Sequence, residues 1–234
     1  MDNFDKRLEV FWETLIDNGG YNDVLTGLKN TVIIAVLGLI IGSLIGTLIA
    51  TVRVIPKYNV LPRVLNGFCS VYVSFFRGTP MVVQLLLFYY VLFPMFDMNI
   101  SSVDVSILVF GLNSGAYISE IMRGGILSVD SGQMEGGRAM GLSFGATMIK
   151  IVIPQAVKNI LPTMGNEFIT LIKETSVLSF IALMDVTKAL KSLADSSFEY
   201  FIPYIVLALT YLVIVLIITG LIKIMEKRFA KNER

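Results

Sequence analysis

Two long stretches without a charged side chain constrain this chain more than any other feature of its sequence. Residues 30–52 and residues 200–222 each run for 23 positions, mostly apolar, without Asp, Glu, Lys or Arg. A helix needs about 20 mostly apolar residues to cross the hydrocarbon core of a bilayer. Both stretches are therefore predicted to be membrane-spanning helices.

The composition of the 234 residues supports this prediction and excludes several other classes of protein. The chain is 55% hydrophobic and 16% charged, with a mean hydropathy of +0.74, whereas soluble domains are about 45–50% apolar and about 25% charged. Disorder requires low hydrophobicity and high net charge. A disulfide scaffold requires several cysteines, and Cys69 is alone. A nucleic-acid partner is not expected at a net charge of +1, and the absence of histidine removes the common metal ligand and general base.

Three further spans are predicted where isolated charges interrupt apolar sequence. These spans and their internal charges are residues 66–94 with Arg77, residues 105–122 with Glu120, and residues 159–184 with Glu167, Lys173 and Glu174. We therefore expect an all-α polytopic membrane protein with about five transmembrane helices.

The basic residues predict the orientation, because Lys and Arg favour cytoplasmic segments. With five spans and the N-terminus outside, twelve of the 19 basic residues fall in cytoplasmic segments and five fall outside. The N-terminus is therefore predicted to be outside and the C-terminus cytoplasmic. Residues 1–24 form an acidic extracytoplasmic segment, expected to contain an amphipathic helix, and nothing in it resembles a cleavable signal. Residues 25–228 form the transmembrane domain, with a cytoplasmic loop at about 128–157, and residues 229–234 form a cytoplasmic tail.

The cytoplasmic loop contains signals for a short helix. Asp130 followed by Gln133 resembles a capping box, so a helix is predicted over about 132–140. Gly141 suits the left-handed residue that closes a helix.

A second short helix is predicted after it. Ser143 can cap a helix that runs to about Lys150, and Pro154 either ends that helix or starts the next segment. The resulting hairpin is either a rigid knob that docks on a partner or a solvated connector between two spans.

Four sequence motifs in order resemble one family of membrane proteins. Glu135-Gly136-Gly137, Gly141, Ile151 and Ile153-Pro154 resemble the EAA loop of importer permeases driven by an ATP-binding cassette. Three other stretches resemble the polar amino-acid branch of this family: residues 77–80 with Gln84, residues 116–126 continuing through Gly132 and Gln133, and residues 173–176. The resemblance covers roughly residues 25–225.

One departure from the motif concerns the stiffness of the loop. Gly136 and Gly137 stand where the family usually has alanines. Because glycine lowers helix stability by about 1 kcal/mol relative to alanine, a softer loop is expected here.

The resemblance implies a permease subunit of the type I importer fold, in the plasma membrane of a bacterium. Its implied partners are a second permease copy or a homologue, two ATP-binding subunits, an extracytoplasmic substrate-binding protein, membrane lipid and a polar amino acid as solute. The chain has no Gly-x4-Gly-Lys-Ser/Thr loop, so no cofactor is expected in it. ATP and Mg²⁺ are expected on the partner subunit, and the chain itself is not expected to be an enzyme. The residues implied in coupling to the ATP-binding subunit are Glu135, Gly136, Gly137, Gly141 and Pro154.

The charges inside the spans are candidates for solute contact. A charge at a helix centre costs about 2.5–3.5 kcal/mol on insertion scales, so it usually faces protein or a wet cavity. Arg77 suits a carboxylate and Glu167 suits an ammonium group, and an amino acid carries both. The candidate pathway residues are Arg77 and the members of two polar helical stripes: Asn113, Tyr117 and Glu120 on one helix, and Asn166, Glu167, Thr170 and Glu174 on the other. Alternatively, Arg77 pairs with a glutamate and only holds the bundle, and Glu120 lies at the membrane edge near Arg123.

Two further alternatives concern packing and function. Gly38, Gly42 and Gly46 form a small-residue ridge that allows close helix approach, and we expect it to serve packing within the chain. A stand-alone channel or secondary transporter is the second functional hypothesis, and a membrane-embedded enzyme is the third. Five spans enclose a polar route poorly, so a dimer of permeases is expected.

Overall fold

The computed structural model describes residues 3–231, and within this range all regular secondary structure is helical. Residues 1–2 of the predicted N-terminal segment and residues 232–234 of the predicted tail lie outside the described part. The N-terminal segment contains α1 (Asn3–Trp12) and a π-helical turn, η1 (Glu13–Asp17), as the expectation of a short helix there requires.

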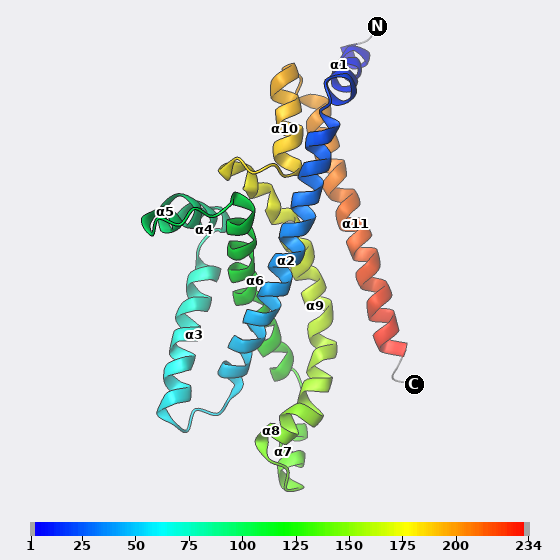
Figure 1. The fold of residues 1–234 in the computed structure, drawn as a ribbon. Helices are drawn as coiled ribbons and strands as arrows, with labels where there is room; N and C mark the ends of the chain where they lie inside the picture. Colours follow the sequence, from blue (N-terminus) through cyan, green and yellow to red (C-terminus); the bar gives the residue numbers. More distant parts are fainter. Residues whose placement is uncertain (1–2, 232–234) are drawn as a thin grey trace. The chain divides into compact units, whose positions relative to one another are not determined.

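Three helices of the described chain are long and apolar enough to cross a membrane. They are α2 (Tyr21–Val54), α6 (Ser102–Leu127) and α11 (Phe201–Lys231), which appear in blue, green and orange-red in Figure 1. The predicted spans at 30–52, 105–122 and 200–222 are therefore confirmed as helices.

The predicted span over residues 66–94 is wrong as an unbroken helix. It is divided between α3 (Val60–Gly78) and a second segment of α4 (Met81–Leu86), η2 (Leu87–Leu92) and α5 (Phe93–Met95). Thr79 and Pro80 between them are extended, with ψ of 145° and 142°. A proline disfavours helical backbone at the preceding residue, which explains the break. Together the two parts form a bent span or a re-entrant segment, which would be the fourth crossing in the described chain.

The predicted span over residues 159–184 is wrong beyond Glu174. Helix α9 (Ile153–Glu174) ends there and a 3-10 turn, η4 (Thr175–Ile181), follows. Ala182 is left-handed (φ 57°), and α10 (Val186–Ser197) then begins at a cap from Asp185. Helix α9 falls short of the apolarity that marks the other spans, so the count of five crossings remains a prediction.

The chain divides into two compact units. The first contains residues up to Gly38, Pro80–Phe110 and Ile169–Ile218, and the second contains Leu39–Thr79, Gly111–Phe168 and residues from Thr219 onward. In the first unit, Val186, Leu190 and Leu193 of α10 form a buried apolar cluster. Partly buried side chains of α2 and α11 pack against this cluster.

The second unit is held by a close approach of α2 and α6. A Cβ atom added at Gly42 would lie 2.7 Å from Ser114 Cβ, and one added at Gly46 would lie 2.7 Å from Ile118 Cγ2. These two positions of the glycine ridge therefore serve packing within the chain, as expected.

Candidate solute pathway and coupling loop

A cluster of charges on three helices surrounds Glu120 of α6 in the second unit. Glu120 Oε1 accepts a hydrogen bond from Arg53 Nη1 of α2. Glu120 Oε2 accepts from Arg123 Nη2 and Nε at 2.8 and 3.0 Å. Arg77 Nη1 of α3 lies 4.0 Å from Oε1. One carboxylate thus faces three guanidinium groups, which leaves an excess of positive charge.

The three arginines differ in how far they are withdrawn from the surface. The side chain of Arg53 is 17% exposed, that of Arg123 is 37% exposed and that of Arg77 is 45% exposed. Arg53 and Arg123 donate hydrogen bonds to Glu120, whereas Arg77 lies 4.0 Å from it. Arg53 and Arg123 therefore neutralise Glu120, while Arg77 is the loosely held and accessible cation of the cluster.

Arg77, in the last turn of α3, lies over the aromatic ring of Tyr117 of α6. Its guanidinium carbon is 5.4 Å from the centroid of Tyr117, within cation–π range. Nearby, Asn113 Nδ2 donates to the carbonyl of Phe76 at 3.3 Å and fixes α6 against α3. The predicted stripe of Asn113, Tyr117 and Glu120 therefore faces Arg77.

The glutamate that pairs with Arg77 is Glu120. Glu167 of α9 accepts from Ser114 Oγ at 3.3 Å and so lies beside α6 in the same unit. Asn166 precedes it on α9 and is exposed.

Thr170 and Glu174 belong to the other compact unit, so the eight candidates do not form one cluster within a unit. Sequence reasoning gave no pairing role to Arg53 and Ser114. Arg53 lies 67 positions from Glu120 in the sequence. The only sequence signal at Arg53 is that it ends the charge-free stretch of residues 30–52, which does not indicate a partner.

The loop predicted to be cytoplasmic, at about 128–157, has the predicted helix–turn–helix form. Helix α7 (Ser131–Ala139) is capped by Asp130, whose Oδ1 accepts from the Gly132 N–H at 2.6 Å. Gly141 is left-handed at φ +87°, as predicted. Gln133 does not close the capping box in the predicted way; its Oε1 accepts from Gln155 Nε2 at 3.4 Å.

The second loop helix continues into α9 without a break. Ser143 Oγ accepts from the Ala146 N–H at 3.2 Å and caps α8 (Phe144–Thr147). A π-helical turn, η3 (Met148–Val152), joins α8 to α9, and Pro154 is the second residue of α9. Pro154 thus belongs to the next segment and does not end the helix before it, although it has no N–H to donate to the preceding turn.

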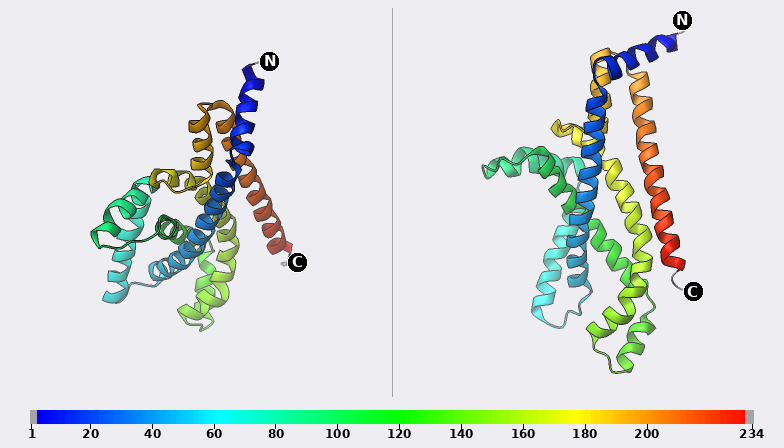
Figure 2. Two further views of the ribbon diagram at one scale, coloured as in Figure 1. Left: turned by 45° about the horizontal axis from the view of Figure 1, so that its top comes forward. Right: turned by 45° about the vertical axis from the view of Figure 1, so that its right-hand side comes forward.

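The two glycines of the motif have different surroundings. Gly136 is open, with nothing within 4 Å of an added Cβ, whereas a Cβ at Gly137 would lie 2.5 Å from Thr147 Cγ2. Gly137 therefore permits α7 to pack against α8, while Gly136 only lowers helix stability. Figure 2 displays α7 and α8 at the start of α9 in both views.

Comparison with known proteins decides the family. Residues 42–231 match the family described as binding-protein-dependent transport system inner membrane component. The chain belongs to this family. The family assignment makes it a permease subunit and a multi-pass membrane protein, and the family implies an ATP-binding subunit and a substrate-binding protein as partners.

Relatives of the family share most of their length with the chain. A protein named as a candidate glutamine transport system permease, GlnP of Rickettsia typhi, is 35% identical over 208 residues, covering 89% of this chain and 91% of its own. The arginine transport system permease protein ArtQ of Bacillus subtilis is 39% identical over 162 residues, covering 69% and 74%.

Solved structures confirm the type I importer permease fold. A chain described as part of the crystal structure of an amino acid ABC transporter with histidines has a TM-score of 0.82 at 36% identity, covering 92% of this chain and 97% of its own. A chain of the MetNI methionine ABC transporter, at 20% identity and a TM-score of 0.63, shares the fold.

Proposed function

We propose that this permease subunit serves an ATP-driven importer of polar amino acids. The observation that carries the proposal is the likeness, over 92% of the chain, to a solved amino acid ABC transporter. The relatives named for glutamine and arginine transport support the same solute class. A stand-alone channel or secondary transporter is not favoured, because the family consists of components of binding-protein-dependent systems.

The proposed complex has two permease subunits in a bacterial plasma membrane, the second being a copy or a homologue. The N-terminus lies outside and the C-terminus lies in the cytoplasm, which places α7 and α8 on the cytoplasmic face. Two ATP-binding subunits bind ATP and Mg²⁺ and carry out hydrolysis, while the substrate-binding protein delivers solute from outside.

The solute route is proposed to pass the polar stripes of α3, α6 and α9. Because Glu120 already has two closer guanidinium partners, Arg77 can bind the carboxylate of a solute without leaving Glu120 uncompensated. Glu167, in the same unit as Arg77, offers a carboxylate to the ammonium group. The remaining pathway residues, which supply hydrogen bonds and an aromatic face, are Asn113, Tyr117, Glu120, Asn166 and Thr170.

The α7–α8 loop is proposed to transmit the movement of the ATP-binding subunit. Glu135 is exposed on α7, and Met140 is 84% exposed beside the turn. Methionine is among the residues enriched at protein interfaces, so Met140 is available to a protein partner. Gly137, Gly141 and Pro154 act by shaping the loop, and Gly136 lies on its open face.

A pair of alanine substitutions tests the coupling role. Gly137→Ala forces α7 away from Thr147 and should reduce ATP hydrolysis in the assembled complex, whereas Gly136→Ala meets open space and should leave it unchanged or raise it. Equal activity of the two variants would contradict the role given to the loop.

The transport proposal is tested by reconstituting the complete complex in vesicles and measuring ATP hydrolysis with each of the twenty amino acids. Stimulation by a small set of polar amino acids is expected. If the purified chain alone carries solute across vesicles without an ATP-binding subunit, the proposal is wrong and the stand-alone transporter is correct.

A further inference from the structure

A groove with a charged mouth lies where α1, the end of α10 and the start of α11 meet in the first unit. Its apolar part has a volume of about 680 Å³ and runs along α11 past Tyr204, Ile205 and Ala208. Its charged part has a volume of about 470 Å³ and lies beside α1. The two parts share Arg7 and Glu199. The solute pathway described above does not use this region.

The mouth of the groove presents both signs of charge. Lys6 and Arg7 line it together with Glu9, Glu13 and Glu199. Arg7 Nε lies 3.7 Å from Glu199 Oε2, and the Arg7 side chain remains 38% exposed. A headgroup that carries only negative charge would meet three carboxylates here, whereas a headgroup with a phosphate and an ammonium group would find a partner for each.

Aromatic side chains surround the apolar part. The Arg7 guanidinium carbon lies 5.3 Å from the centroid of Phe201, and Tyr200 and Tyr204 lie 6.1 Å apart beside it. Tyrosine and tryptophan concentrate at the level of lipid headgroups, and Trp12 of the neighbouring α1 is also exposed. The charged mouth therefore lies at the depth where the headgroups of a bilayer would be, if α11 crosses it.

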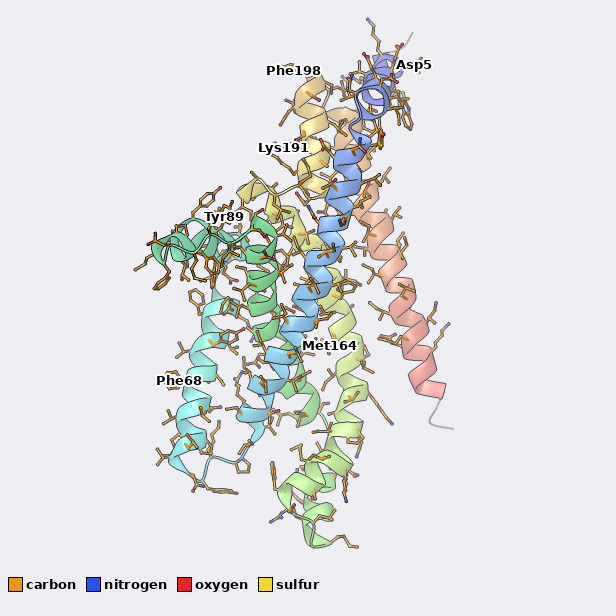
Figure 3. The ribbon with its side chains drawn as sticks, viewed as in Figure 1. Asp5, Phe68, Tyr89, Met164, Lys191 and Phe198 are labelled. Carbon is orange, nitrogen blue, oxygen red and sulfur yellow. The ribbon has the colours of Figure 1, made fainter. Side chains whose placement is uncertain are left out.

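Phe198 presents an exposed apolar ring at the junction of the two parts of the groove. It ends α10 in the left-handed conformation (φ 53°) with 85% of its surface exposed, and it lines both parts of the groove. Positive φ is unusual for a bulky residue, and an uncovered phenyl ring is unfavourable in water. Figure 3 labels Phe198 at the end of α10.

We propose that this groove binds one phospholipid with a zwitterionic, primary-ammonium headgroup, as in phosphatidylethanolamine. Arg7 binds the phosphate, and the carboxylates of Glu9, Glu13 and Glu199 bind the ammonium group. One acyl chain lies along the apolar part on α11 and covers Phe198.

Native mass spectrometry of the full-length chain tests the headgroup. With equal amounts of phosphatidylethanolamine and phosphatidylglycerol, retention of one phosphatidylethanolamine, several-fold preferred, is expected. Glu9→Gln combined with Glu13→Gln removes carboxylates that bind the ammonium group and should remove that preference. Arg7→Gln removes the partner of the phosphate and should lower retention of the lipid itself. Lys191→Gln removes a cation from an exposed position of α10 outside the groove and should change neither. Equal retention of the two lipids by the unchanged chain overturns the proposal.

Filling the groove tests the acyl site without altering the charges. A phosphatidylethanolamine with a photoreactive acyl chain should label α11 near Ala208, and Ala208→Trp should abolish this labelling. Leu209→Trp places the same indole ring at the neighbouring exposed position and should not. The proposal is wrong if Ala208→Trp keeps full labelling. A second outcome also overturns the proposal. If Arg7→Gln and Ala208→Trp both retain the lipid but abolish stimulation of ATP hydrolysis in the complete complex by its substrate-binding protein, the groove binds that protein and not a lipid.

Discussion

The two compact units each contain a largely buried carboxylate, and they satisfy it in different ways. Glu120 is met by arginine side chains from three helices. Asp185 is fully buried, and its Oδ1 and Oδ2 accept from the backbone N–H groups of Lys188 and Thr187 at 2.9 and 3.0 Å. Backbone donors are fixed once α10 forms, whereas long side chains can exchange partners. Asp185 is therefore assigned a structural role, whereas the arginine partners of Glu120 can change during transport.

The largest effect is expected from Glu120→Gln. Removing the carboxylate leaves the largely withdrawn Arg53 without its counter-charge, and breaking a buried pair costs about 3–5 kcal/mol. Because Glu120 is 18% exposed, a value of about 3 kcal/mol is expected, seen as a fall in the melting temperature of the purified complex. An unchanged melting temperature would show that the cluster is solvated.

Arg77→Ala should separate function from stability. The loss of a charge-assisted contact to solute, worth about 1.5–3 kcal/mol, should lower solute-stimulated ATP hydrolysis at limiting solute about 10- to 100-fold. The melting temperature should barely change, because a half-exposed pair at 4.0 Å contributes little.

Arg53→Ala is the matched control for this pair. It removes a buried partner of Glu120 and should lower the melting temperature. Full solute stimulation in well-folded Arg77→Ala protein would mean that Arg77 is not a solute ligand.

Substitutions of Asp185 should have a smaller effect that is confined to stability. Asp185→Ala removes the cap of α10 and should cost about 1–2 kcal/mol, whereas Asp185→Asn keeps an acceptor and should cost less. Both should retain solute-stimulated ATP hydrolysis per folded complex. Loss of stimulation in folded Asp185→Asn protein would contradict a purely structural role.

The smallest expected effect is a dependence of stability on pH. Burial raises the pKa of Asp185 above its usual range, although the N–H groups of Lys188 and Thr187 oppose this. The folded protein therefore binds this proton more tightly than the unfolded chain does. Its contribution to stability grows as the pH falls through the raised pKa and is lost as the pH rises through it.

Asp185→Asn should remove this contribution. Melting temperatures measured from neutral pH down to about pH 4, near the unperturbed value of aspartate, should differ less between acid and neutral conditions in the variant. Parallel curves for the two proteins would contradict the raised pKa.

Local signals in the sequence predicted local structure well. Asp130 and Ser143 each cap a residue two or three positions away, and Gly141 closes its own helix. Each of these contacts depends only on neighbouring backbone, so the residue type is sufficient to predict it.

Contacts between distant helices could not be predicted in the same way. The partner of Arg77 proved to be Glu120, because the register between helices is set by packing that no single helix encodes. The break at Thr79–Pro80 could have been predicted, since Pro80 disfavours a helical conformation of the residue before it. The apolar sequence around it suggested one continuous span instead. For the same reason, the apolar residues after Glu174 led to a predicted span up to residue 184, and the helix cap at Asp185 was not predicted.

The join between the α7–α8 loop and α9 has a mechanical consequence. From Ile153 to Glu167 the helix is continuous, a distance of about 21 Å at 1.5 Å per residue. A hydrogen-bonded helix resists compression, so an axial thrust that reaches Ile153 through η3 would be passed along α9 to Glu167. Pro162 lies within this stretch and omits one backbone hydrogen bond, so sideways strain would be absorbed at Pro162 before it reaches the carboxylate.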